Sequence, residues 1–88
     1  MNLNSIVFPD SLPSLDLHGY DRESARVAIL DFIKDNKVMK RPFLVVVHGV
    51  GSGIIRKVTL ETLRNNKNVL DFKLLNGNNG CTIVQIKV

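Results

Sequence analysis

The sequence of 88 residues has little that would support a disulfide framework, a paired-cysteine metal site or a membrane span. Cys81 is the only cysteine, which excludes an intrachain disulfide and a zinc site of paired cysteines. The longest apolar run, Phe43 to Val47, is far too short to cross a bilayer. The N-terminus lacks the basic and apolar regions of a secretory signal. We therefore expect a cytoplasmic protein without a membrane partner.

The chain is also too short for two hydrophobic cores or for a large enclosed cavity. Hydrophobic residues make up 44% of it and charged residues 23%, which is ordinary for one folded globular domain. The 12 Lys and Arg residues against 8 Asp and Glu residues give a formal net charge of +4. This charge is compatible with a nucleic-acid partner, although many basic domains bind none.

Hydrophobic periodicity predicts the order strand, helix, strand, helix, strand, strand. Residues 1–14 read as an extended N-terminal arm, and residues 15–88 as the domain. This order favours an α/β fold, a two-layer sandwich in which two helices cover one face of a four-stranded mixed sheet. The predicted strands are 15–17, 43–47, 69–75 and 82–88, and the predicted helices follow Asp21 and Ser52.

Specific residues support these elements. Asp21 is a good N-cap for a helix that extends to about residue 36, and Ser52 is placed to cap the second helix. The run from Phe43 to Val47 is typical of a central strand that is covered on both sides. Lys73, Gln85 and Lys87 indicate that one face of the sheet meets water.

Two histidines occupy equivalent places, because His18 and His48 each end a predicted strand and each precede a glycine. The carboxyl ends of parallel strands form one edge of a sheet, and open α/β sheets bind ligands at that edge. Two imidazoles there can serve as a general acid and a general base, with Asp16 orienting a ring or accepting a proton. A hydrogen-bonded turn histidine is the plainer alternative for each.

The glycines at 49, 51 and 53 do not form a known nucleotide motif. Ile54 stands where a dinucleotide fingerprint needs its third glycine, and no Gly-Lys-Ser/Thr follows. Ser52 also lacks the flanking glycines of a nucleophile elbow. There remains a glycine turn that leads into a helix with Arg56 and Lys57 in its first turn, an arrangement that suits a phosphate. A tight turn with solvated charges is the alternative.

Three motifs in order resemble the Smr (small MutS-related) domain over roughly residues 15 to 88. They are Leu15-Asp16-Leu17-His18-Gly19, then His48-Gly49-Val50-Gly51-Ser52-Gly53 with Ile55-Arg56, then Gly80-Cys81-Thr82-Ile83-Val84. The resemblance implies a fold similar to the C-terminal domain of translation initiation factor three. It also implies nucleic-acid binding, with endonuclease activity in several members. Val50 departs from the pattern, since this place is often basic in the family.

We expect one of two functions. In the first, Asp16, His18 and His48 are catalytic in phosphodiester cleavage of DNA or RNA. One histidine deprotonates the attacking oxygen and the other protonates the leaving oxygen. The residues expected to hold the phosphate or stack a base are Gly49, Gly51, Ser52, Gly53, Arg56, Lys57 and Tyr20. In the second, the domain binds DNA, RNA or a ribosome without cutting it.

No metal ligands are assigned and no cofactor is certain, with a divalent cation left open. A 2′-hydroxyl nucleophile needs no metal, which makes RNA the chemically easier substrate. The start at Met1 and the short arm favour a stand-alone protein, which we expect to be a monomer.

Overall fold

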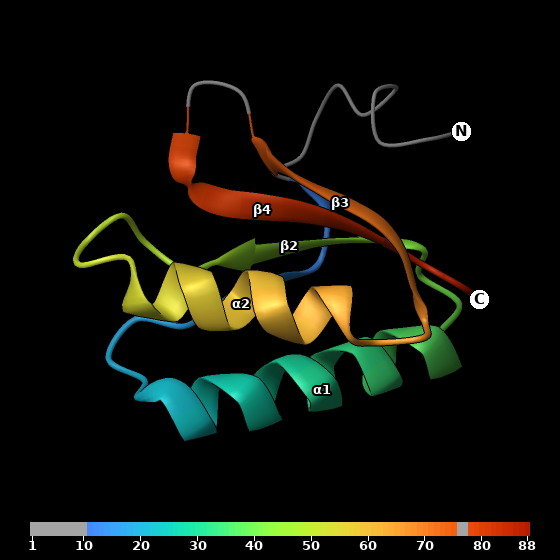
Figure 1. Cartoon of the computed structure of the whole chain (residues 1–88). Helices are drawn as coiled ribbons and strands as arrows, with labels where there is room; N and C mark the ends of the chain where they lie inside the picture. The colour runs from blue at the N-terminus through green and yellow to red at the C-terminus, as the bar shows by residue number, and fades with distance from the viewer. Residues whose placement is uncertain (1–10, 76–77) are drawn as a thin grey trace.

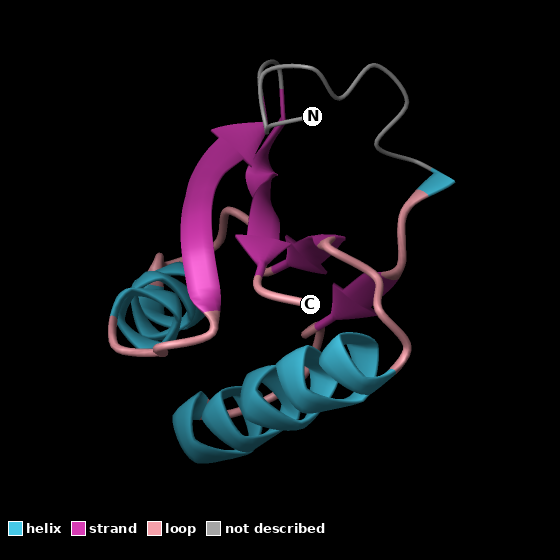
Figure 2. Cartoon of the chain, turned by 90° about the vertical axis from the view of Figure 1, so that its right-hand side faces the viewer, coloured by secondary structure: helices cyan, strands magenta, loops and turns pink. Residues whose placement is uncertain are grey.

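The computed structural model describes residues 11–75 and 78–88, and within them the predicted order of elements is confirmed. In chain order, the elements are β1 (Ser14–Asp16), α1 (Arg22–Val38), β2 (Phe43–Val47), α2 (Ile54–Arg64), β3 (Val69–Leu75) and β4 (Asn78–Ile86). Both helices lie on the same side of the strands (Figure 1), and the view turned by 90° shows the same two layers (Figure 2). The predicted two-layer α/β fold is therefore confirmed.

The four strands form one mixed sheet in the order β1-β2-β4-β3. β1 and β2 are parallel, whereas β4 runs antiparallel to both β2 and β3. The run from Phe43 to Val47 forms one of the two central strands, as predicted, and its first four residues are buried. Val46 stands opposite Thr82, and Val47 stands opposite Cys81. The last strand of the chain therefore lies beside the strand that leads to His48.

The main core lies between the sheet and the helices. Its buried members come from β2, β4, both helices and the residue after β1, and they are Leu17, Ala25, Ile29, Ile33, Leu44, Val46, Leu63, Val84 and Ile86. The other face of the sheet is less wet than predicted, because Phe43 and Ile83 are buried there with Leu12 and Leu75 packed against them. Side chains along a strand point alternately to the two faces of the sheet. Phe43 and Ile83 therefore lie on the face away from the helices, and Leu44, Val46, Val84 and Ile86 lie on the face toward them.

Some predicted boundaries were wrong by a few residues. β4 begins at Asn78 rather than at residue 82, because a register irregularity after Leu74 lets Leu75 pair with Asn78. β1 begins one residue before Leu15, which is within the usual scatter of strand ends. Residues 1–10 of the expected arm lie outside the described residues, so the division at residue 14 stays a prediction.

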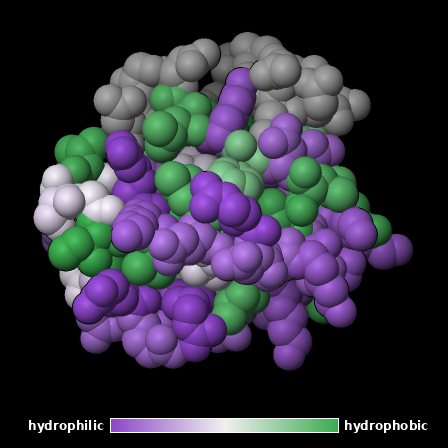
Figure 3. All heavy atoms as spheres, viewed as in Figure 1, coloured by the Kyte–Doolittle hydropathy of each residue, from purple (hydrophilic) through white to green (hydrophobic). Residues whose placement is uncertain are grey.

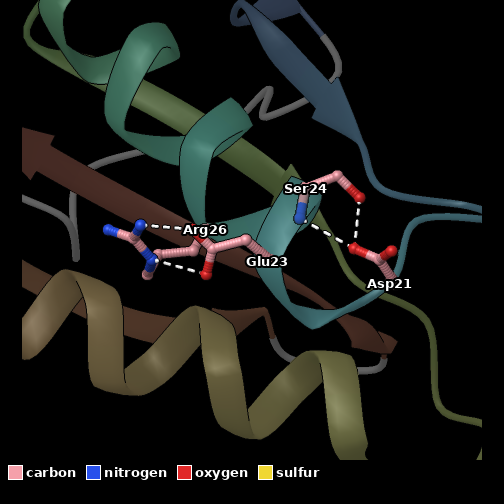
Figure 4. A network of polar contacts seen from close by, with 4 residues as sticks. All are labelled: Asp21, Glu23, Ser24 and Arg26. Atoms are coloured by element: carbon pink, nitrogen blue, oxygen red, sulfur yellow. Dashed lines mark hydrogen bonds and ion pairs between the residues drawn. The ribbon is translucent and has the colours of Figure 1, made fainter.

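The N-terminus of α1 is fixed beside the end of β1. The Asp21 carboxylate accepts a hydrogen bond of 2.8 Å from the Ser24 backbone N–H, as predicted for an N-cap. Glu23, in the first turn of the helix, forms an ion pair with Arg26 (Figure 4). This cap starts the helix directly after the turn that contains His18.

Candidate functional site

The three sequence motifs meet at the carboxyl edge of the parallel strands, where backbone hydrogen bonds join them. The Leu17 N–H donates to the Val47 carbonyl at 2.9 Å, which links the first motif to the second. The N–H groups of His48 and Gly49 both donate to the Gly80 carbonyl, each at 2.9 Å. The loops that follow β1 and β2 therefore emerge side by side, at the left of Figure 1.

A hollow of about 400 Å³ lies between these two loops. It brings together six of the predicted site residues with four neighbours, and its lining is Asp16, Leu17, His18, Gly19, Tyr20, Val47, His48, Gly49, Gly51 and Ile55. We call it the histidine hollow. It is the place where both histidine motifs can act on one ligand.

His18 is exposed and stands in a tight turn. The Tyr20 N–H donates to the Leu17 carbonyl at 3.1 Å, and Gly19 takes the positive φ of 81° that such a turn requires at its third residue. The Asp16 carboxylate accepts from the His18 backbone N–H at 2.9 Å. Asp16 therefore braces the turn, and its predicted role of orienting an imidazole or accepting a proton stays a prediction.

His48 has a different environment, since its side chain is only 8% exposed. Its Nδ1 lies 2.9 Å from the Gly49 carbonyl oxygen, and its Nε2 lies 2.8 Å from the Thr82 hydroxyl oxygen. A carbonyl can only accept, so we infer that Nδ1 carries the proton and that Nε2 accepts from the hydroxyl. Both ring nitrogens are thus engaged within the protein.

Burial sets the charge state of this ring. Loss of solvent lowers the pKa of His48 below its usual range, because the charged imidazolium is disfavoured in the interior. The hydrogen bond to Gly49 raises the pKa in part, and the positive charge of Arg56 lowers it further. His48 is therefore neutral near pH 7.

The glycine loop leads into α2 without help from a side chain. Gly53 is the N-cap residue, with a φ of 83°, and no side chain caps this end of the helix. The predicted cap by Ser52 is therefore wrong, because Gly53 rather than Ser52 occupies the cap position. The first N–H groups of an uncapped helix are available to an anion.

Two further hollows continue from the loop. A hollow of about 190 Å³ is lined by His48, Gly49, Gly51, Ser52, Gly53, Ile54, Ile55 and Arg56. Another of about 370 Å³ runs along α2 and is lined by Gly53, Arg56, Lys57, Leu60, Glu61 and Arg64. Arg56 borders both of these hollows, whereas Lys57 borders only the one along α2. The predicted phosphate-binding residues are therefore spread along a path that extends beyond the histidine hollow.

A hollow of similar size, about 430 Å³, lies between the two helices. It contains none of the motif residues, and two of its charged side chains, Glu23 and Arg26, pair with each other. The histidine hollow is the better candidate for a functional site, because residues with acid–base or phosphate-binding chemistry from two separate motifs converge there.

Thr82 belongs to the site although sequence reasoning assigned it no role. It is fully buried on the helix-facing side of β4, opposite Val46, and its hydroxyl bonds to His48. The sequence did contain a sign of this role. Thr82 is a polar residue on the same side of its strand as the apolar Val84 and Ile86, which face the core. A buried hydroxyl at such a place requires a partner.

Neither a metal centre nor a membrane span is visible in the described ranges. No three His, Cys, Asp or Glu side chains among residues 11–75 and 78–88 gather closely enough to hold a metal ion. No helix within the same ranges is both long and apolar enough to cross a bilayer.

The buried imidazole predicts a pH dependence of stability. The folded-state pKa of His48 lies below the ordinary value of about 6.5 that holds in the unfolded chain, so the unfolded chain takes up the proton more readily. The stability that the neutral His48 ring contributes is therefore fully present above pH 6.5 and is lost as the pH falls below 6.5. We expect the thermal midpoint to fall between pH 7 and pH 5, and to fall less in His48→Gln. An equal fall in both proteins would contradict the assignment.

Substitution of Gly51 should affect ligand binding without lowering the stability of the fold. Its φ lies outside the left-handed region, and a Cβ added there would meet no atom within 4 Å, so nothing in the described chain requires a glycine. We expect Gly51→Ala to leave stability unchanged or slightly raised, and to weaken ligand binding in the hollow. Gly49→Ala is the matched control, because its φ of 76° makes alanine cost about 1 kcal/mol. Unchanged nucleic-acid affinity in Gly51→Ala would refute close approach of a ligand here.

Comparisons with known proteins identify the family and agree with the fold. The family model described as "Smr domain" matches residues 15–87. Proteins named "Endonuclease MutS2" from Streptococcus suis and Brevibacillus brevis are each 36% identical over 76 residues, which is 83% of this chain. The chain spans only 10% of the length of these relatives.

Solved structures resemble the fold closely. The Smr domain of Thermus thermophilus MutS2 superposes with a TM-score of 0.84 at 25% identity, over 88% of this chain and 100% of that one. YdaL, a stand-alone small MutS-related protein from Escherichia coli, has a TM-score of 0.79 at 20% identity, over 85% and 64% of the two chains. Because the family model covers nearly all of the described residues, the chain belongs to the Smr domain family.

Proposed function

We propose that this domain binds the phosphodiester backbone of a nucleic acid at the histidine hollow and cleaves it, with His18 transferring the proton. The observation that carries the proposal is the position of an exposed histidine in the hollow that the glycine loop also lines. Arg56 stands in the adjoining hollow and supplies a positive charge. Phosphodiester cleavage needs a proton-transfer group together with donors that stabilise the charge on the phosphate oxygens.

The chemistry is simplest for RNA. His18 removes the proton from a 2′-hydroxyl, and the oxygen forms a bond to the adjacent phosphorus. The bond between phosphorus and the 5′ oxygen then breaks and leaves a 2′,3′-cyclic phosphate. The leaving oxygen takes a proton from a water molecule, and the resulting hydroxide takes back the proton that His18 holds. The loop N–H groups and Arg56 hold the phosphate while its negative charge builds up. In DNA a water molecule has to replace the 2′-hydroxyl as the nucleophile.

His48 fits a positioning role better than a proton-transfer role. Both of its ring nitrogens are in hydrogen bonds, and its side chain is almost fully buried. Proton transfer by Nε2 would require the ring to give up its bond to Thr82. In our proposal His48 holds Gly49 in place for the phosphate, and His18 acts on the substrate.

The names of the relatives support an activity on nucleic acids. The curated relatives are called endonucleases, but this chain matches only a tenth of each, so their activity is a proposal here. Contact with a ribosome, a monomeric state, a cytoplasmic location and any need for a divalent cation stay predictions.

The second candidate is a binding module that docks on DNA or RNA without cutting it. The hydrogen bonds of both His48 ring nitrogens favour this candidate. Acid–base catalysis commonly uses two groups, and with His48 held in these bonds His18 is the one exposed histidine of the site. Such a module would show salt-sensitive binding and no cleavage products.

Cleavage assays separate the two candidates. We expect labelled single-stranded or double-stranded RNA or DNA to give products that depend on His18, and parallel incubations with EDTA report any metal requirement. His18→Ala should lower the cleavage rate by about 10²- to 10⁴-fold, the range for loss of a general acid or base. Its thermal midpoint should not change, because the side chain is exposed.

Lys34→Ala is a matched control, since Lys34 is exposed on α1 and lines none of the three hollows. Products at the wild-type rate in His18→Ala would refute the catalytic proposal. Salt-dependent binding with no products from any of the four substrates would favour the binding module instead.

The hollow along α2 predicts that removing a positive charge and removing a negative charge there change nucleic-acid affinity in opposite directions. Arg64 and Glu61 line the same hollow, and neither forms an ion pair within the described part of the chain. Arg64→Gln should weaken nucleic-acid binding and reduce the slope of log K against log salt by about 1, because one phosphate contact is lost. Glu61→Gln should strengthen binding. Fluorescence anisotropy over a salt series measures both, and equal slopes in all three proteins would refute this path.

A further inference from the structure

Three large apolar side chains surround the site and face water. Tyr20 is 40% exposed, Ile54 is 52% exposed, and Val50 is 65% exposed. Tyr20 lines the histidine hollow, and Ile54 lines the loop hollow beside it. Val50 stands between Gly49 and Gly51, which line both hollows. We call these three residues the apolar rim.

The surface around the apolar rim is hydrophobic in one part and hydrophilic in another. In Figure 3, hydrophobic surface is present at the left edge, where Figure 1 places the loop between β2 and α2, and hydrophilic surface dominates over the two helices. Arg56 and Lys57, in the first turn of α2, are exposed and have no ion-pair partner in the described ranges. The edge therefore offers cations and apolar contacts to the same ligand. A single exposed apolar residue needs no explanation, but a group around a hollow suggests a binding surface.

A nucleotide with an unpaired base has this combination of properties. Its phosphate is an anion, and its base presents a flat apolar face that aromatic and aliphatic side chains can contact. In a duplex the base faces are stacked inside, and a protein reaches only the backbone and the base edges in the grooves. A duplex would therefore leave the apolar rim without a partner.

We propose that the site selects an unpaired strand, with its phosphates at Arg56 and Lys57 and its bases against Tyr20, Val50 and Ile54. This inference rests on the proposed function and adds the substrate class and the residues that select it. The positive charge beside the rim favours a nucleic acid over an apolar protein segment, because the path along α2 has three cations, at Arg56, Lys57 and Arg64, against one acid, Glu61.

The test compares strands that differ only in their bases. A short single-stranded oligonucleotide, an abasic strand of the same length and charge, and a duplex of the same sequence are titrated at one salt concentration. Stacking contributes about 1–3 kcal/mol per base, so we expect the wild-type protein to bind the abasic strand about 5- to 150-fold more weakly. The duplex should also bind more weakly than the single strand.

Two variants assign the effect to the rim. In Val50→Ser with Ile54→Ser, and separately in Tyr20→Ala, the affinity ratio between the normal and abasic strands should move toward one. Arg64→Gln is the matched control, because it should weaken binding of both strands by the same factor and leave that ratio unchanged. Circular dichroism verifies that each variant is folded, and the comparison of strands on the wild-type protein needs no variant.

The outcomes also separate this inference from the proposed function. Equal wild-type affinity for the normal and abasic strands, or a duplex that binds as tightly as the single strand, would overturn selection of an unpaired strand while backbone binding stands. If no nucleic acid binds at all, the proposed function is overturned as well, and a protein partner becomes the better explanation of the rim.

Discussion

The buried His48 is the interaction on which the rest of the site depends. Its backbone N–H bonds to Gly80, and its ring bonds to Thr82 and to the Gly49 carbonyl. These contacts attach the glycine loop to β4, so the loop is anchored to the sheet before α2 begins. A buried hydrogen-bonded pair of this kind is costly to disturb, because either partner left alone keeps its desolvation penalty. The geometry of the glycine loop therefore follows from a contact in the core.

The candidate site divides into a buried inner part and an exposed outer part. His48 and Thr82 are buried, whereas His18, Arg56 and Lys57 are exposed. Two histidines in equivalent sequence positions therefore have different environments. His48 continues the inward alternation of Leu44 and Val46, and His18 lies in a turn that is closed beyond the end of β1.

Much of the fold follows from local patterns in the sequence. The apolar run at 43–47 identified a central strand, the helical periodicity identified α1, and Asp21 correctly identified its cap. The resemblance of the three motifs to the Smr domain is confirmed by the family model. The order strand, helix, strand implied that the first two strands are parallel, and this placed both histidine motifs at one edge of the sheet.

The parts that sequence reasoning missed depend on tertiary contacts. The role of Thr82 requires knowing that β4 pairs with β2, a contact between residues far apart in the chain. The predicted cap at Ser52 was wrong because serine and glycine are both acceptable at a cap, and the local sequence does not decide which residue takes it. The burial of His48 depends likewise on the elements packed around it.

The position of β4 in the sheet also has a consequence for the order in which the domain is made. β4 is the last strand of the chain, yet it lies between β2 and β3, and it carries both Gly80 and Thr82. A nascent chain that ends before Asn78 contains both histidine motifs but lacks Gly80 and Thr82, so the Gly49 carbonyl is the one partner of His48 that it retains. During synthesis on the ribosome, the glycine loop thus gains its anchor only when β4 has emerged, so a chain that stops before β4 has both histidine motifs without the contacts that join them to that strand.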